Sequence, residues 1–148
     1  MFTPGTLIYF TPFHFKNGNT PKPKYGIVLS NFHDNQGVMI SLPTRRDNVP
    51  SKYDNQFGCI DKLEIGFNCF LIQKNVPVTD NGFSFPLKTH LYGTNLDSFD
   101  LNDFESTYPN EGSDYKIIGT LLPSVFDNIL DCFKKSRVIT QRLKRLLY

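Results

Sequence analysis

The sequence predicts a mainly β fold, in which a small antiparallel barrel is followed by a C-terminal α-helix. Short apolar runs separated by Gly, Pro, Asn and Asp recur along the chain, and this pattern is typical of an all-β barrel. The chain has 14 Phe, 7 Tyr and no Trp among 148 residues, a composition that suits a β-rich core. At this length we expect one domain over residues 1–148, with the barrel at about 1–122 and a helical segment at about 123–148.

Six strands are expected in order along the barrel. They lie near residues 6–10, 25–31, 38–43, 68–73, 88–93 and 115–121. The first two contain near-continuous apolar runs and should therefore be central in the sheet. They are joined by a long loop, Thr11 to Lys24, and long loops in compact domains usually have a function or are disordered. The turn His33 to Gly37 then makes the second and third strands an antiparallel hairpin.

Residues 94–114 fit neither a strand period nor a helical one, so we expect a surface excursion with one short helix. The tail is different, because its apolar residues follow helical spacing from Pro123 onward. A basic stretch at 134–137 interrupts this spacing, which predicts either one long helix or two shorter ones. The second half is basic and amphipathic, and three surfaces suit it: a partner, a membrane surface or the protein's own barrel.

The charge is unevenly distributed, although the net charge is only +2. Residues 1–52 carry six Lys or Arg and two Asp, and residues 133–148 carry six Lys or Arg and no acid. An acidic run lies between them, at Asp97, Asp100, Asp103, Glu105, Glu111 and Asp114. The first third is therefore either ordinary solvated surface or an anion-binding face.

The cysteines and the apolar runs bear on the cellular compartment. Cys59, Cys69 and Cys132 are odd in number and lack CxxC spacing, which favours reduced thiols in the cytoplasm and argues against a zinc site. No apolar run approaches the length that crosses a bilayer, and the N-terminus lacks the charged start of a secretory signal. We therefore expect a cytoplasmic protein with no membrane partner and no cofactor.

A candidate phosphate site follows from the hairpin. Lys24 begins the second strand, and Thr44, Arg45 and Arg46 follow the third. In an antiparallel pair these two ends are neighbours. The arrangement brings a hydroxyl and three cations together.

The same segments resemble, in order and spacing, the MazF/PemK family of growth-inhibiting ribonuclease toxins. The resemblance covers Gly5 to Phe10, Tyr25 to Ser30, Val38 to Thr44 and Lys116 to Leu130. It implies an SH3-like barrel and a toxin-type endoribonuclease that cleaves single-stranded RNA without metal. It also implies a homodimer and a neutralising antitoxin. By position, Lys24 matches the family's phosphate-binding Arg and Thr44 its catalytic Thr, while Tyr25 stands where the family has Pro.

Metal-free cleavage needs a proton acceptor for the 2′-hydroxyl, a proton donor for the leaving oxygen and positive charge at the phosphate. Lys24 can supply charge, Thr44 a hydrogen bond, and His14 acid–base chemistry, because imidazoles titrate near neutrality. Phe13 and Phe15 can stack on unpaired bases. The cations expected to bind nucleic acid are Lys16, Lys22, Arg45 and Arg46.

Each of these residues also has an ordinary structural interpretation, as a loop cation, a turn residue or an aromatic anchor. The rival function is a non-catalytic module on the same barrel that binds nucleic acid or protein, and replacement of the family's Arg by Lys24 favours it. The acidic segment 94–114 offers a third possibility, either as a protein-binding surface or as a cover over the basic site.

Overall fold

The computed structural model describes residues 2–42 and 56–147. Eight strands are described: β1 (Thr6–Phe13), β2 (Lys22–His33), β3 (Gln36–Ser41), β4 (Gly58–Lys62), β5 (Phe67–Ile72), β6 (Thr89–Tyr92), β7 (Leu96–Asp100) and β8 (Tyr115–Thr120). The helices are α1 (Leu101–Thr107), α2 (Pro123–Lys135) and α3 (Gln141–Leu146), with the 3-10 turns η2 (Leu63–Ile65) and η3 (Gly93–Asn95). The mainly β, antiparallel architecture with a C-terminal helix is confirmed.

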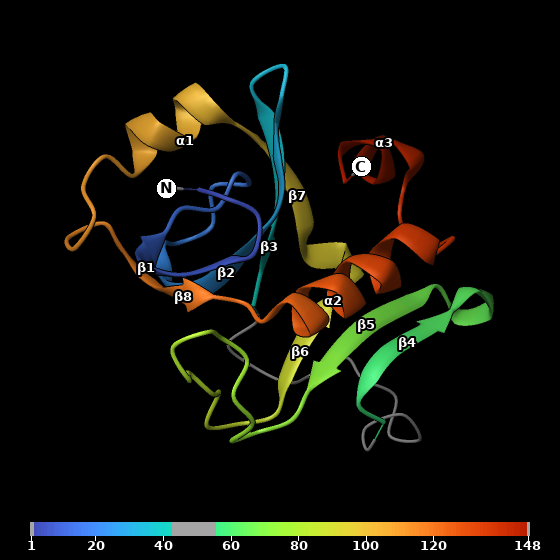
Figure 1. Ribbon diagram of the computed structural model, residues 1–148. Coiled ribbons are helices and arrows are strands. Elements are labelled where there is room, and N and C mark those ends of the chain that lie inside the picture. Colours follow the sequence, from blue (N-terminus) through green and yellow to red (C-terminus); the bar gives the residue numbers. More distant parts are fainter. Residues whose placement is uncertain (1, 43–55, 148) are drawn as a thin grey trace.

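The strands form two sheets (Figure 1). A five-stranded sheet has the order β7-β3-β2-β1-β8, and a three-stranded sheet has the order β4-β5-β6. All six expected strands are present, with ends that differ by up to three residues. Sequence patterns missed β4 and β7, which are both edge strands. Both are only five residues long, and β4 buries a single side chain, that of Ile60.

The prediction that the first two strands are central is confirmed, and the reason lies in their two buried faces. Alternate residues of β2 enter different cores: Ile27 packs with the main core beneath α2, and Val28 packs with a second, aromatic core. Strand β1 divides in the same way, with Leu7 on the first side and Ile8 on the second. Because both faces are covered, these strands have a continuous apolar sequence.

The β2–β3 hairpin forms as predicted. Asp34 and Asn35, at its tip, have φ values of 51° and 66°, a left-handed conformation that Asp and Asn tolerate better than most residues. The hairpin register sets Gly26 opposite Ser41. A Cβ at Gly26 would lie 2.9 Å from Phe10 Cε2 and 3.1 Å from Met39 Sδ. Glycine is therefore required for the close approach of these two side chains.

The surface excursion expected at 94–114 is partly wrong. Strand β7 pairs with β3 along its whole length, and Leu96, Phe99 and Phe104 are buried. The expected short helix is present as α1, and Asp100 caps it by accepting a hydrogen bond from the Asp103 N–H at 3.1 Å. A strand that passes directly into a helix changes its period at that point, so neither pattern could be recognised.

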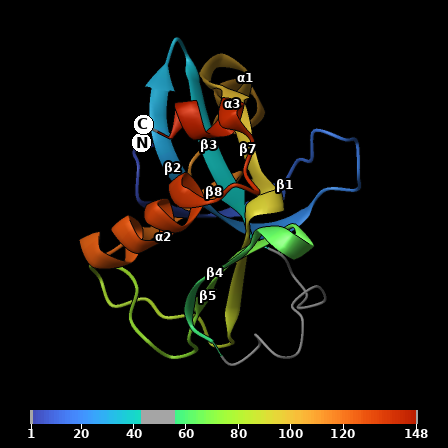
Figure 2. The ribbon, with the colours of Figure 1, turned by 90° about the vertical axis from the view of Figure 1, so that its right-hand side faces the viewer.

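The tail forms two helices and packs on the protein itself. Pro123 starts α2 in its first turn, and Ser136 separates α2 from α3. Ile139 and Leu147 are only 6% and 4% exposed in the main core, and Figure 2 shows α3 beside β3 and β7. Of the three surfaces considered for the tail, the structure shows the tail packed on the protein's own core.

The expectation of three reduced thiols is wrong for two of them. Cys59 on β4 and Cys132 on α2 form a disulfide across 73 residues of sequence, and Cys69 is a buried free thiol. Sequence spacing carries no information about a pair brought together by the packing of a helix on a sheet. Among the residues that the structure describes, no helix is long and apolar enough to cross a membrane.

Candidate functional site

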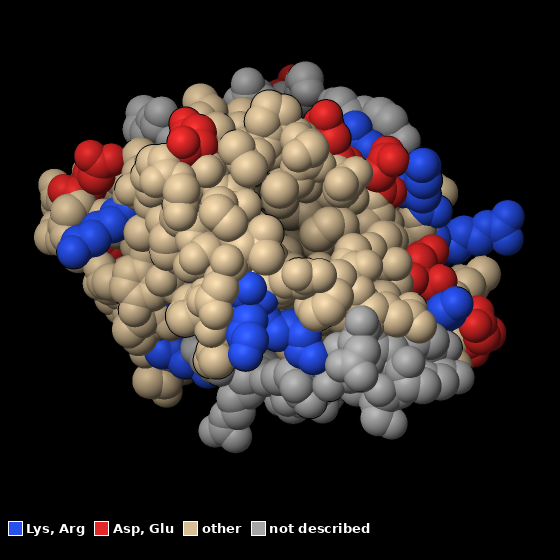
Figure 3. All heavy atoms as spheres, turned by 60° about the horizontal axis from the view of Figure 1, so that its bottom comes forward, with Lys and Arg blue, Asp and Glu red and all other residues tan. Residues whose placement is uncertain are grey.

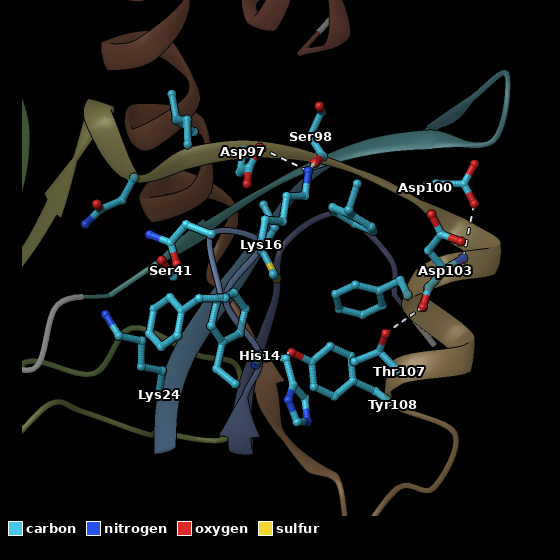
Figure 4. A pocket seen from close by; sticks show the side chains of 18 of the residues that line it. His14, Lys16, Lys24, Ser41, Asp97, Ser98, Asp100, Asp103, Thr107 and Tyr108 are labelled. Carbon is cyan, nitrogen blue, oxygen red and sulfur yellow. Dashed lines mark hydrogen bonds and ion pairs between the residues drawn. The ribbon is translucent and has the colours of Figure 1, made fainter. Parts of the chain in front are cut away.

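A pocket with a volume of about 1050 Å³ lies at the edge of the aromatic core. One wall is the segment that follows β1, and the other is β7 with α1 (Figure 4). Its floor contains Met39, Phe99, Phe104 and Tyr108, which also belong to the aromatic core. The pocket is thus built on rigid, well-packed residues. Five of the residues predicted from the sequence line it: Phe13, His14, Phe15, Lys16 and Lys24.

Lys24 is a buried strand residue rather than a solvated loop cation. Only 9% of it is exposed, and its Nζ donates a hydrogen bond to the Leu42 carbonyl at 3.1 Å. Burial, with a smaller contribution from the charge of Lys22, lowers the pKa of Lys24 below its ordinary value. The hydrogen bond also joins the start of β2 to the end of β3, which confirms that these ends are neighbours as far as Leu42.

Phe15 brings two of the predicted cations together. The Nζ of Lys24 lies 5.4 Å from the centroid of its ring, and the Nζ of Lys22 lies 5.9 Å from it. Ammonium groups at these distances are attracted to the ring face. Phe13 packs edge-on against Phe15, with 5.1 Å between the ring centroids. Both Phe rings remain half-exposed and can therefore contact a ligand.

His14 is exposed at the rim and is positioned through its main chain. Its backbone N–H donates to the Tyr108 hydroxyl at 2.8 Å, and the two rings lie 5.7 Å apart. Burial raises the pKa of Tyr108, partly offset by this hydrogen bond. Tyr108 therefore stays a neutral phenol and fixes the backbone of His14. The imidazole of His14 lies next to Tyr108 in the pocket lining (Figure 4).

Lys16 reaches across the pocket to the acidic wall. Its Nζ lies 3.2 Å from Asp97 Oδ1 and also donates to the Ser98 carbonyl, as the dashed lines in Figure 4 show. Both charged side chains are more than half exposed, at 61% and 58%, so the pair contributes little to stability. Lys16 is thus tied to the segment that the sequence offered as a cover for the basic site.

The opposite wall carries carboxylates. Asp100 and Asp103 line the pocket beside α1, at the far end of Figure 4 from Lys24. Asp100 is occupied in capping α1 and also accepts from Asn35 Nδ2 at 3.2 Å. The described lining is therefore mixed in charge: cations and aromatic rings on one side, carboxylates on the other. Sequence reasoning offered this acidic run as one possible cover over the basic site, but it did not predict β7, whose pairing with β3 brings Asp97 and Asp100 to the pocket lining.

The remaining residues predicted from the sequence are not among the described residues that line the pocket. Lys22 contacts Phe15 from outside the pocket lining. Thr44, Arg45 and Arg46 lie outside the described residues. Tyr108 and Met39 were missed, since a Tyr after a short helix and a Met within a strand are ordinary core residues by pattern. Only the tertiary contact with His14 marks Tyr108 as part of the site.

Away from the pocket, charge is mixed as well. Figure 3 shows the lower side of Figure 1, where cations and acids are scattered around a broad uncharged area. Exposed apolar side chains include Val76 and Leu87, which are 43% and 73% exposed. In residues 2–42 and 56–147, no three His, Cys, Asp or Glu side chains are grouped as metal ligands would be. No known family model, curated protein or solved structure matches the chain.

Proposed function

We propose that the pocket binds single-stranded RNA and that the protein is a divergent, metal-independent endoribonuclease of the MazF/PemK type. One observation carries the proposal: His14, Lys24, Phe13 and Phe15, chosen from the sequence alone, line one pocket. A proton-transfer group, a cation and two half-exposed rings are the parts that cleavage of an unpaired strand requires. The SH3-like barrel, the homodimer and an antitoxin partner belong to the same proposal.

The chemistry assigns one role to each group. His14 takes the proton of the attacking 2′-hydroxyl, and Lys24 stabilises the charge that grows on the phosphate. The leaving oxygen takes its proton from water. Phe13 and Phe15 hold the flanking bases. Thr44, Arg45 and Arg46 stay in the proposal as further phosphate ligands.

The second candidate is a non-catalytic binding module for nucleic acid or protein. Two contacts favour it: the Lys24 ammonium already donates to the Leu42 carbonyl, and Lys16 is paired with Asp97. Each cation must exchange a protein acceptor for a phosphate oxygen before it can act. A module that only binds tolerates this exchange, whereas a catalyst needs donors that are already free and aimed at the reacting group.

Cleavage assays on purified protein separate these functions. Single-stranded RNA of mixed sequence, with a chelator present, is incubated with the wild type and with Lys24→Ala, Lys24→Arg and His14→Gln. Loss of one charge-stabilising contact costs about two to three orders of magnitude in rate. Loss of the acid–base group costs about two to four. Lys24→Arg should retain activity, because arginine keeps the positive charge and can hold a phosphate with two parallel hydrogen bonds.

The matched control is Lys116→Ala, an exposed cation of β8 outside the pocket lining. It should cleave as the wild type does. Equal rates for the wild type and Lys24→Ala would remove Lys24 from the mechanism. Binding of RNA by the wild type with no cleavage of any sequence would favour the non-catalytic module.

A further inference from the structure

A second pocket lies beside the disulfide, far in sequence from the first. It has a volume of about 420 Å³ and is lined by Gly58, Cys59, Asp61, Phe70, Asn128, Asp131, Cys132 and Lys135. Helix α2 and strand β4 form its sides, and Figure 1 shows them next to each other. Both sulfur-bearing residues line this pocket, so a molecule inside it touches the disulfide.

The two halves of the disulfide are unequally accessible. Cys59 is exposed on the edge strand β4, whereas Cys132 is only 3% exposed in the main core. In thiol–disulfide exchange, the attacking thiolate needs a straight approach to one sulfur while the other leaves. Accessibility makes Cys59 the sulfur that is attacked and Cys132 the sulfur that leaves.

The surroundings of Cys132 suit a leaving sulfur. The Nδ2 of Asn68 lies 3.7 Å from Cys132 Sγ and can donate to the sulfur as it gains negative charge. The Oδ1 of the same carboxamide is buried and accepts no hydrogen bond. A reduced Cys132 has an acceptor for its S–H in the Cys69 carbonyl oxygen, which lies 3.8 Å from Cys132 Sγ.

The pocket also offers a place for the attacking thiol. Lys135 lines it, paired at its outer side with Asp131 at 3.0 Å. A cation near the sulfur favours the thiolate form of an attacking thiol. The lining has room for a small molecule and contains the disulfide cysteines, the apolar ring of Phe70, one cation, and the carboxylates of Asp61 and Asp131.

We propose that Cys59 is a modification site for small thiols, which form a mixed disulfide with it in the second pocket. The thiolate of the small molecule attacks Cys59 Sγ, a new S–S bond forms, and the Cys59–Cys132 bond breaks. Cys132 leaves as a thiolate and takes a proton from solvent. No other oxidant is needed, because one disulfide is exchanged for another. The reaction breaks the covalent link between α2 and β4 and leaves Cys132 as a free thiol at the pocket.

The test uses the full chain, oxidised in air, and reduced glutathione as the probe. Aliquots are quenched with iodoacetamide and mapped by peptide mass spectrometry. The expected first product carries one glutathione on Cys59 and one carbamidomethyl on Cys132. Cys69 should stay unlabelled in the native protein, because burial raises the pKa of its thiol to about 12. The same mapping in denaturant should label it.

Two variants sharpen the assignment. Lys135→Gln should slow adduct formation roughly two- to fivefold at low salt, the range of an exposed charge contact. Lys134→Gln, its neighbour outside the pocket lining, should leave the rate unchanged. Adducts found first on Cys132, an intact mass without any disulfide, or a rate that follows the unfolded fraction as urea is added would each overturn the proposal.

Discussion

The five-stranded and three-stranded sheets differ in how much apolar surface they bury. The central strands of the five-stranded sheet bury both faces, and its aromatic core contains Phe10, Phe104 and Tyr108. The cluster specific to the three-stranded sheet is small: Ile60, Cys69, Leu71 and Tyr92, with Phe67 beside it. At its tip Leu63 and Ile65 are about half exposed, at 51% and 53%.

Polar and covalent contacts compensate for the thin packing of the three-stranded sheet. Asp61 of β4 accepts hydrogen bonds from Asn68 Nδ2 at 3.0 Å and from Ser136 Oγ at 2.5 Å, and the disulfide joins β4 to α2. The first sheet is therefore held mainly by apolar burial, whereas the second adds specific links to the burial of Phe70, Ile72 and Leu91 in the main core. Substitutions that weaken the apolar packing should leave the polar and covalent links intact, and the reverse should also hold.

The largest expected effect comes from removing the covalent link. Cys59→Ser opens a loop of 73 residues, which by chain entropy costs about 4 kcal/mol of the free energy of unfolding. Urea unfolding of the variant under non-reducing conditions measures it. The reduced wild type is the control and should match the variant. A variant as stable as the oxidised wild type would show that packing alone holds α2 on β4.

The next effect targets the first sheet through its close packing. Gly26→Ala places a methyl group 2.9 Å from the Phe10 ring and 3.1 Å from Met39 Sδ, and overpacking of this kind costs about 1–3 kcal/mol. Phe10→Leu in the same chain should recover part of this loss, because it vacates the contact. Double-mutant analysis of urea unfolding tests the coupling. Strictly additive costs would contradict the proposed clash.

A smaller effect should appear in the pH dependence of stability. Burial lowers the pKa of Lys24 in the folded state from 10.5. Between the lowered value and 10.5 the unfolded chain binds more protons, so this residue makes stability rise with pH across that window. Lys24→Met removes the rise and should be at least as stable as the wild type at neutral pH. Thermal melts of both proteins from pH 7 to pH 10 give the difference, which isolates Lys24 from the other titrating groups.

The smallest effect concerns the contact across the first pocket. Asp97→Asn removes the partner of Lys16 and should strengthen RNA binding roughly two- to fivefold at low salt. Lys16→Met should weaken binding and flatten its salt dependence. Glu105→Gln, an exposed acid of α1 outside the pocket lining, serves as the control. An unchanged affinity for Asp97→Asn would mean that Lys16 does not contact the ligand.

Local sequence patterns predicted most of the strands and helices. The features that were missed depend on contacts between segments that are distant in the sequence. The central strands and α2 were predictable because apolar runs and helical spacing are properties of neighbouring residues. Strand β7 was not, since five residues leading directly into α1 leave no complete period. The pairing of Cys59 with Cys132 depends on where α2 lies over β4, which no spacing in the chain encodes.

The candidate site divides in the same way. Lys24, His14, Phe13 and Phe15 were found because the hairpin and its preceding loop are local features. Tyr108 and Asp97 reach the pocket because β7 pairs with β3, and this is a contact between distant segments. Sequence reasoning found the basic wall and offered the acidic segment as a possible cover, but it did not identify Tyr108 or the strand pairing that brings Asp97 to Lys16.

Strand β3 lies between the two walls, with β2 on one side and β7 on the other. The first pocket therefore exists only in the folded chain, where segments about 80 residues apart meet, as the separation of 81 between Lys16 and Asp97 illustrates. A compound that occupies it binds the native state alone and stabilises that state by mass action, by about 2.7 kcal/mol at a hundredfold excess over Kd. Thermal-shift screening of nucleotides and short oligonucleotides can thus find ligands of this protein before any activity is known.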